Sequence, residues 1–251
     1  MKKSVNSDNA TDNKILSSSM SVIEHLDELR KRILYSIVSI FIAFIISWAY
    51  SKKIFEYIVK PAIIYLNPNG KLSFFTIPEP FILYMKVAFV TSLFLSSPFV
   101  LTQLWLFISP GLYKKEKIYA IPFIFFTAIF FIAGGIFGYK VIFPLTCKFL
   151  LNYGEDFNAV IRITDYFSFF SKVIIGVGLI FEMPVLAFFL AKLKILHYRF
   201  LAKNFKYAIL VIFIIAAIVT PSTDAITQIA LAVPMIILYL ISIIIVWLVN
   251  H

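Results

Sequence analysis

Apolar residues gather in six stretches of the chain, separated by segments rich in charged, proline and glycine residues. An α-helix rises 1.5 Å per residue, so about 20 apolar residues cross a hydrocarbon layer about 30 Å thick. The pattern predicts six transmembrane helices, at residues 33–50, 81–108, 118–139, 167–193, 207–219 and 226–249. The fifth would be about 20 Å long, which is shorter than the hydrocarbon layer. We therefore predict an all-α polytopic membrane protein with a shortened fifth helix.

The segment before the first predicted span has the pattern of an amphipathic helix. Ser21 and Glu24 have the spacing of a capping box, which marks a helix start. Apolar residues then recur at helical spacing, at Val22, Leu26, Leu29 and Ile33. Such a helix would lie in the membrane interface and run into the first span. Because residues 1–20 are polar, we expect a disordered tail there, followed by one membrane domain over residues 21–251.

Two connecting segments are long enough to be predicted as loops. Residues 51–80 contain Pro61, Pro68 and an Asn-Gly pair, and residues 140–166 contain Gly154 beside polar residues. The middle of the first segment, residues 54–66, is apolar enough to lie on the membrane surface.

Composition supports the membrane assignment. The 251 residues are 61% hydrophobic and 14% charged, whereas soluble domains carry about 25% charged residues. A soluble fold of this length has too small an interior to bury so much apolar surface. The net charge is +10, but the basic residues lie between the apolar stretches and no nucleic-acid-binding motif is present. We therefore expect no nucleic acid partner.

The basic residues also predict the orientation. Segments 1–32, 109–117 and 192–206 would share one side of the membrane, and they carry about twice as many Lys and Arg residues as the opposite loops. The side richer in Lys and Arg is cytoplasmic under the positive-inside rule. Both the N-terminus and the C-terminus are therefore predicted to be cytoplasmic.

Motifs for nucleotide-dependent or hydrolytic chemistry do not occur in the sequence. The chain has no Walker A sequence, no GxGxxG, no HExxH and no GxSxG. Its one cysteine and three scattered histidines form neither a disulfide framework nor a metal-ligand cluster. We predict a protein that is not an enzyme and that needs no cofactor or metal.

Glu182 is the most unusual acidic residue, because it falls near the middle of the fourth predicted span. An ionisable group at this depth is costly and usually faces protein or a water-filled cavity. It could relay protons or contact something that enters the membrane. It could also be a neutral, hydrogen-bonded structural group, or be paired with a basic residue.

Three other acidic residues lie at or near the ends of predicted spans. Glu28 and Arg32 are spaced i,i+4 and could form a surface ion pair worth a few tenths of a kcal/mol. Glu116 lies among lysines, where it could simply balance charge. Asp224 follows Pro221 in a short turn, where it could cap a helix.

Seven short segments resemble the TatC family, the multi-spanning core subunit of the twin-arginine protein translocase. They are His25–Arg32, Ser97–Pro98, Gln103–Trp105, Phe107–Glu116, Phe181–Pro184, Thr220–Asp224 and Ala232–Met235. Each is weakly specific alone, but all occur in the family's order and at its topological places. The resemblance extends from Ser21 to about Tyr239, and the short fifth span is also similar to the family, whose short helices are thought to thin the bilayer.

The resemblance implies a receptor for signal peptides that carry two consecutive arginines. In the family, the acidic positions matching Glu28 and Glu116 bind the twin-arginine motif, and the resemblance extends this site to Arg30, Phe107 and Leu112. Two planar, permanently charged guanidiniums match two carboxylates in forked geometry. The cargo would be a folded protein, exported by the proton-motive force rather than by ATP.

The resemblance also implies partners in the bacterial cytoplasmic membrane. Glu182 matches a polar group on a concave, lipid-facing surface, where a partner helix or the signal hairpin would meet it. Pro61 and Asp224 match positions with structural or partner-contact roles. Small single-span subunits of the TatA and TatB type, and further copies of this chain, are expected to assemble with it. Many relatives carry an acidic residue after the apolar stretch of the sixth span, whereas here Tyr239 is followed by Leu240.

Two other functions are compatible with the residues alone. A proton-coupled small-solute transporter could use Glu182, and it would be expected to have inverted repeats and discontinuous helices near the midplane. A scaffold that only assembles other membrane proteins is the second. Binding of a twin-arginine peptide, but not of its twin-lysine version, would separate both from a signal-peptide receptor.

Overall fold

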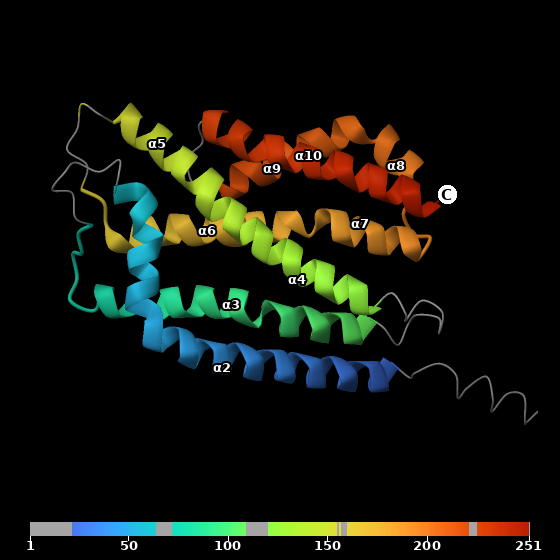
Figure 1. Cartoon of the computed structure of the whole chain (residues 1–251), viewed down its shortest axis with the longest axis horizontal. Coiled ribbons are helices and arrows are strands. Elements are labelled where there is room, and N and C mark those ends of the chain that lie inside the picture. Colours follow the sequence, from blue (N-terminus) through green and yellow to red (C-terminus); the bar gives the residue numbers. More distant parts are fainter. Residues whose placement is uncertain are drawn as a thin grey trace, which may run out of the picture.

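The protein is a bundle of long helices. The computed structural model describes residues 22–63, 72–108, 120–154, 156, 160–220 and 225–250. Its helices are α2 (Val22–Ile63), α3 (Glu79–Ile108), α4 (Ala120–Phe137), α5 (Phe143–Tyr153), α6 (Ile163–Phe181), α7 (Met183–Lys192), α8 (Tyr198–Lys203), α9 (Phe205–Val219) and α10 (Ala225–Asn250). A π-helical turn, η3 (Gly138–Ile142), joins α4 to α5. Figure 1 shows most of the long helices running in roughly the same direction.

The prediction of an all-α membrane protein is confirmed. Within the described residues, five helical stretches are long and apolar enough to cross a membrane, and the 15-residue α9 is a shorter apolar helix. The short fifth span predicted at residues 207–219 corresponds to α9. The predicted tail, residues 1–20, and the capping residue Ser21 lie outside the described residues.

The loop predicted from residue 51 is wrong for residues 51–63, because α2 continues as one helix to Ile63. In Figure 1 the cyan end of α2 turns away from its blue part and crosses towards other helices. Two hydrogen bonds to backbone carbonyls hold this end, from Tyr166 to Ile58 (2.8 Å) and from Tyr139 to Tyr57 (2.7 Å). Ile58 is buried against the protein, so this segment does not simply lie on the membrane surface as predicted.

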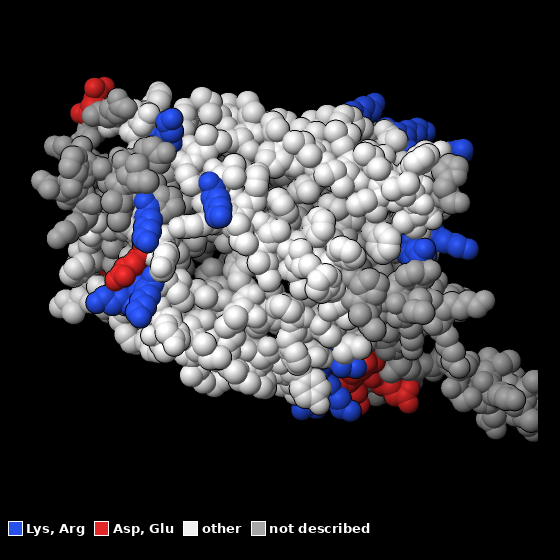
Figure 2. Space-filling model, viewed as in Figure 1, with Lys and Arg blue, Asp and Glu red and all other residues white. Residues whose placement is uncertain are grey.

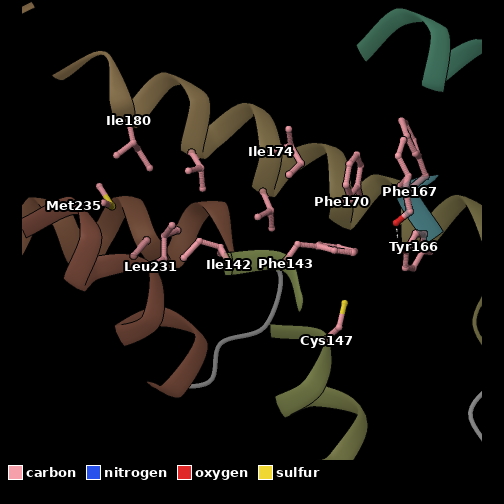
Figure 3. Close-up of a cluster of buried hydrophobic side chains, with 14 of the residues drawn as sticks. Ile142, Phe143, Cys147, Tyr166, Phe167, Phe170, Ile174, Ile180, Leu231 and Met235 are labelled. Carbon is pink, nitrogen blue, oxygen red and sulfur yellow. Dashed lines mark hydrogen bonds between the residues drawn. The ribbon is translucent and has the colours of Figure 1, made fainter. Parts of the chain in front are cut away.

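The second predicted loop is also helical over residues 140–153. The chain passes from α4 through η3 into α5 without a break, and the π-helical turn absorbs one wide turn of backbone. Phe143, the first residue of α5, is fully buried and packs edge-to-face against Tyr166 and Phe170 of α6. Figure 3 shows Ile142 and Phe143 facing the α6 side chains. The loop prediction is therefore wrong for residues 140–153, whereas residues 160–162, just before α6, are not helical.

The fourth predicted span is two helices, because α6 ends at Phe181 and α7 begins at Met183. Pro184 lacks a backbone N–H and cannot make the helical bond four residues back. The Glu182 N–H instead bonds the Leu179 carbonyl at 3.1 Å, and the helix resumes when the Leu186 N–H bonds the Glu182 carbonyl at 2.9 Å. Glu182 therefore lies at a break in the helix.

Two glycines let α4 and α6 approach each other closely beside this break. A Cβ atom added at Gly134 would lie 2.8 Å from the Phe181 Cβ and 2.9 Å from the Gly178 Cα. Backbone atoms cannot yield, so only glycine fits at this crossing. Close approach through small residues is a common way for membrane helices to associate.

Glu79 ties the segment before α3 to the start of α6. Its side chain is 2% exposed. Its carboxylate accepts hydrogen bonds from Arg162 Nε at 2.7 Å, Thr164 Oγ1 at 2.6 Å, and the Phe75 and Thr76 N–H groups at 2.9 and 3.3 Å. The bond to Glu79 raises the pKa of the Arg162 guanidinium, so the pair stays charged. These four hydrogen bonds to one buried carboxylate fix the position of the segment before α3 relative to the start of α6.

We predict that Glu79→Gln lowers the midpoint of thermal unfolding by several degrees. The glutamine amide keeps one acceptor oxygen. Its NH₂ group replaces the other oxygen, so some of the N–H and O–H donors that now bond the carboxylate would have no acceptor. The measurement is thermal unfolding of the purified chain in detergent, with Glu56→Gln as control, since Glu56 is exposed on α2. Equal midpoints for the two variants would show that this cluster does not hold the fold.

Candidate functional site

The first helix of the bundle starts beside the end of the second, and polar residues connect them there. Arg32 Nη1 of α2 donates a hydrogen bond to Gln103 Oε1 of α3 at 3.1 Å. About two turns nearer the start of α2, His25 stacks on Phe107 with ring centroids 4.4 Å apart and an angle of 21° between the rings. These two contacts fix the register of α2 and α3 at the end predicted to face the cytoplasm.

Glu28 lies between these contacts. Its Oε1 accepts a hydrogen bond from Arg32 Nη2 at 3.1 Å, so the expected i,i+4 ion pair forms. The Glu28 side chain is 18% exposed and that of Arg32 27%. Such a pair contributes little to stability, but Arg32 also bonds Gln103 and so fixes the direction of the carboxylate. Glu28 Oε2 accepts no hydrogen bond from any described residue, which leaves it able to accept one from a ligand.

A hollow of about 560 Å³ lies against this part of α2. It is lined by Glu24, Asp27, Glu28, Lys31, Arg32 and Tyr35. Acidic side chains outnumber basic ones in the lining, and Figure 2 shows red carboxylates gathered at the start of α2. A cationic peptide would be attracted to this hollow, although salt would screen the attraction at an open surface.

The structure brings some of the predicted site residues together and leaves others apart. Glu28 and Phe107 share the site at the junction of α2 and α3. Arg30 is exposed, and it lies two residues from Glu28, so the two side chains do not face each other on a helix. Pro61 is near the other end of α2. Leu112, Glu116 and Asp224 lie outside the described residues.

Glu182 is a second, separate polar position inside the bundle. It is 6% exposed, and neither carboxylate oxygen has a hydrogen-bond partner among the described residues. No basic side chain pairs with Glu182 among those residues, so the ion-paired interpretation has no support there. The backbone of Phe131 in α4 is the polar group that acts on its carboxylate. A buried polar group without a partner is costly, so its presence indicates a function.

Sequence reasoning missed two contributors to the site at the α2–α3 junction, and it missed Glu79, which ties the start of α3 to the start of α6. Gln103 is 6% exposed and is the acceptor that orients Arg32. It lies in a segment that resembles the family, but the sequence does not reveal which residue it contacts. His25 begins a segment that resembles the family, but its stacking on Phe107 depends on the register of two helices. Glu79 lies between Pro78 and Pro80, a helix-start signal that could have singled it out.

Together these features define a polytopic membrane protein with a ligand-accessible acidic site where two spanning helices meet. Comparison with known proteins agrees with this class. The model of the family "Sec-independent protein translocase protein (TatC)" matches residues 24–234. The chain belongs to the TatC family, and it is a component of a Sec-independent protein translocase.

Individual relatives cover nearly the whole chain. The Sec-independent protein translocase protein TatC of Koribacter versatilis is 44% identical over 234 residues, which are 92% of this chain and 86% of that protein. TatC of Helicobacter pylori strain J99 is 43% identical, over 90% of this chain and 88% of its own length. A crystal structure described as the twin arginine translocase receptor TatC matches with a TM-score of 0.80 and 33% identity, covering 91% of this chain and 100% of that one.

Proposed function

We propose that this chain is the receptor subunit of its translocase, and that it binds twin-arginine signal peptides where α2 meets α3. The observation that carries the proposal is Glu28, whose carboxylate is held by Arg32 and keeps one oxygen open towards an acidic hollow. A related protein solved as a crystal structure is described as a twin arginine translocase receptor, which supports the same role.

The chemistry of the site favours arginine over lysine as its ligand. A guanidinium is planar and presents paired N–H donors to a carboxylate, whereas an ammonium is a compact point charge with a stronger hydration shell. Within the chain, Arg32 shows how one guanidinium serves two acceptors at once, since its two terminal nitrogens donate to Glu28 and to Gln103. Glu116 would supply the second carboxylate from the segment after α3.

Export of the bound cargo requires further subunits. We infer that small single-span partners of the TatA and TatB type assemble with the chain in the bacterial cytoplasmic membrane, and that several copies form the receptor complex. The proton-motive force would supply the energy, since the sequence carries no nucleotide-binding motif. The unpartnered carboxylate of Glu182 would then receive a polar contact from a partner helix or from the inserted signal hairpin.

One structural observation favours the alternative, a proton-coupled small-solute transporter. The break between α6 and α7 at Glu182 is the kind of discontinuity that such transporters have near the midplane. The helix resumes after a single residue, however, and the halves of the sequence show no convincing internal repeat. The family assignment therefore outweighs this alternative.

Site-specific photo-crosslinking tests the proposed receptor function. Phe107 stacks on His25, three residues before Glu28 on α2. A photo-reactive phenylalanine analogue at Phe107 should crosslink a folded precursor carrying a twin-arginine signal peptide in membranes that contain the chain. The same analogue at Tyr57, which is 63% exposed on the distant part of α2, should give no adduct. Equal adducts at the two positions, or none at Phe107 with the chain folded, would contradict the proposal.

A further inference from the structure

An apolar groove opens on the surface of the bundle between α4, α7 and α10. Its volume is about 380 Å³. It is lined by Phe126, Phe130, Pro184, Val185, Phe188, Ile245, Leu248 and Val249. The groove and the acidic hollow on α2 share no lining residue, and the proposed function above does not use the groove.

The groove lining on α7 runs from Pro184 to Phe188, which is a rise of about 6 Å. With the next turn, which ends at Lys192, the rise is about 12 Å, close to half of the ~30 Å hydrocarbon thickness. An α-helix of about 10 Å diameter and this length would occupy roughly 900 Å³, more than twice the volume of the groove. A single hydrocarbon chain is much thinner, so it fits where a whole helix does not.

Basic residues lie beyond the groove, at the C-terminal end of α7. Lys192 lies four residues after Phe188, so both side chains project from one face of α7, and Lys194 comes in the turn beyond. The end of α10 lies beside this turn, because Asn250 Nδ2 bonds the Leu196 carbonyl at 3.4 Å. No acidic residue occurs from position 183 to 220. Figure 2 shows blue side chains at the end of α7 and over α8, without red among them.

Lys194 has a backbone conformation that favours glycine. Its φ is +59°, and it occupies the residue after the cap of α7. The Lys194 N–H bonds the Ala191 carbonyl at 2.9 Å and the Ile195 N–H bonds the Leu190 carbonyl at 3.0 Å, which is the Schellman arrangement. A lysine in this left-handed position stores backbone strain, and such strain tends to persist where a side chain has a function.

We propose that this groove binds one anionic phospholipid. One acyl chain lies along the groove between α7 and α10, and the phosphate group lies at Lys192 and Lys194, at the predicted cytoplasmic surface. Basic pockets between transmembrane helices on this side of a membrane have the chemistry that recognises anionic headgroups. The apolar lining of the groove would hold the acyl chain, and the two lysines would favour a lipid with a negatively charged headgroup.

The test uses the purified full chain in detergent, titrated with phosphatidylglycerol or with phosphatidylcholine of the same acyl chains, and native mass spectrometry counts bound lipid. We expect phosphatidylglycerol to bind more tightly. Lys194→Gly should weaken its binding about fivefold, the effect of one lysine near a membrane surface, while the thermal midpoint stays equal or rises because glycine relieves the strain. If Lys194 had a purely structural role, its replacement would not lower the affinity for lipid while the thermal midpoint stays equal or rises.

Two further variants distinguish lipid binding in the groove from a general effect of positive charge on the protein. Lys148→Gln also removes one positive charge, but from α5 and the opposite end of the bundle, so it should leave the affinity for phosphatidylglycerol unchanged. Leu248→Trp narrows the groove and should reduce binding of both lipids. Equal affinity for the two lipids, equal effects of the Lys194 and Lys148 variants, or tight binding to the Leu248→Trp chain would each overturn the proposal.

Discussion

Glu28→Ala and Glu116→Ala should each weaken the binding of a twin-arginine peptide by at least about tenfold, which corresponds to about 1.4 kcal/mol. Truncating one partner of a partly desolvated charge pair costs on the order of 2 to 5 kcal/mol. In the Glu28→Ala chain the loss has a second cause. Arg32 would keep its bond to Gln103, but its charge would then be unneutralised and would repel the incoming arginines. Glu116→Lys should be worse than Glu116→Ala, because repulsion adds to lost attraction.

The fold should survive these substitutions. The Glu28–Arg32 pair is partly exposed, and surface pairs contribute little to stability. Glu56→Ala, which removes an exposed acid from the distant part of α2, is the matched control and should bind peptide normally. If both carboxylates serve one site, the double alanine variant should be less than additive. Unchanged affinity in folded Glu28→Ala and Glu116→Ala chains would contradict the assignment of this site.

The second large effect is expected at Glu182, where stability and export should change in opposite directions. Glu182→Leu removes a buried carboxylate that has no partner among the described residues, so the thermal midpoint should stay the same or rise. The leucine cannot make a polar contact with a partner, and export should fall about tenfold, as for the loss of about 1.4 kcal/mol. Glu182→Gln keeps hydrogen bonding and should retain much of the export.

Met183→Leu is the matched control for this series, because it changes the neighbouring residue at the same helix break without adding or removing a polar group. Export of a folded reporter from cells measures the function, and unfolding of the purified chains measures stability. If the Glu182→Gln and Glu182→Leu chains both folded and both failed to export, ionisation of Glu182 would be essential. That result would favour a proton relay, as in a proton-coupled transporter, over a polar contact.

The hydrophobic pattern predicts the membrane helices well because their burial in lipid is a property of each segment alone. The short α9 and the long α3 and α10 end close to where apolar residues give way to polar ones. The i,i+4 pair of Glu28 and Arg32 is likewise predictable, since both residues belong to one helix.

The pattern fails where distant parts of the chain decide the local structure. Residues 51–63 are held by hydrogen bonds from Tyr139 and Tyr166 to their carbonyls, and α2 also contacts α5. No local signal in the sequence records those contacts. The continuation of α4 into α5 depends on the burial of Phe143. The break at Glu182 was visible in principle, since Pro184 removes a helical hydrogen bond, but a continuous apolar stretch outweighs one proline in a hydropathy argument.

The candidate site shows the same division. Family resemblance pointed to Glu28 and Phe107, but the way Arg32 links Glu28 to Gln103 depends on the register of α2 against α3. Arg30 belongs to the same motif, yet helical geometry directs it away from Glu28. A motif read along the chain therefore identifies the segment, and the fold selects which of its residues meet.

The central claim is that this chain recognises paired arginines, and one binding measurement tests it most directly. The purified full chain in detergent is titrated with a fluorescent signal peptide that carries two arginines, and with an otherwise identical peptide that carries two lysines. Both peptides have the same charge, so general electrostatic attraction is equal for the two. We predict that the twin-lysine peptide binds at least about tenfold more weakly, because an ammonium cannot form the forked contact. Equal affinities for the two peptides would contradict the account.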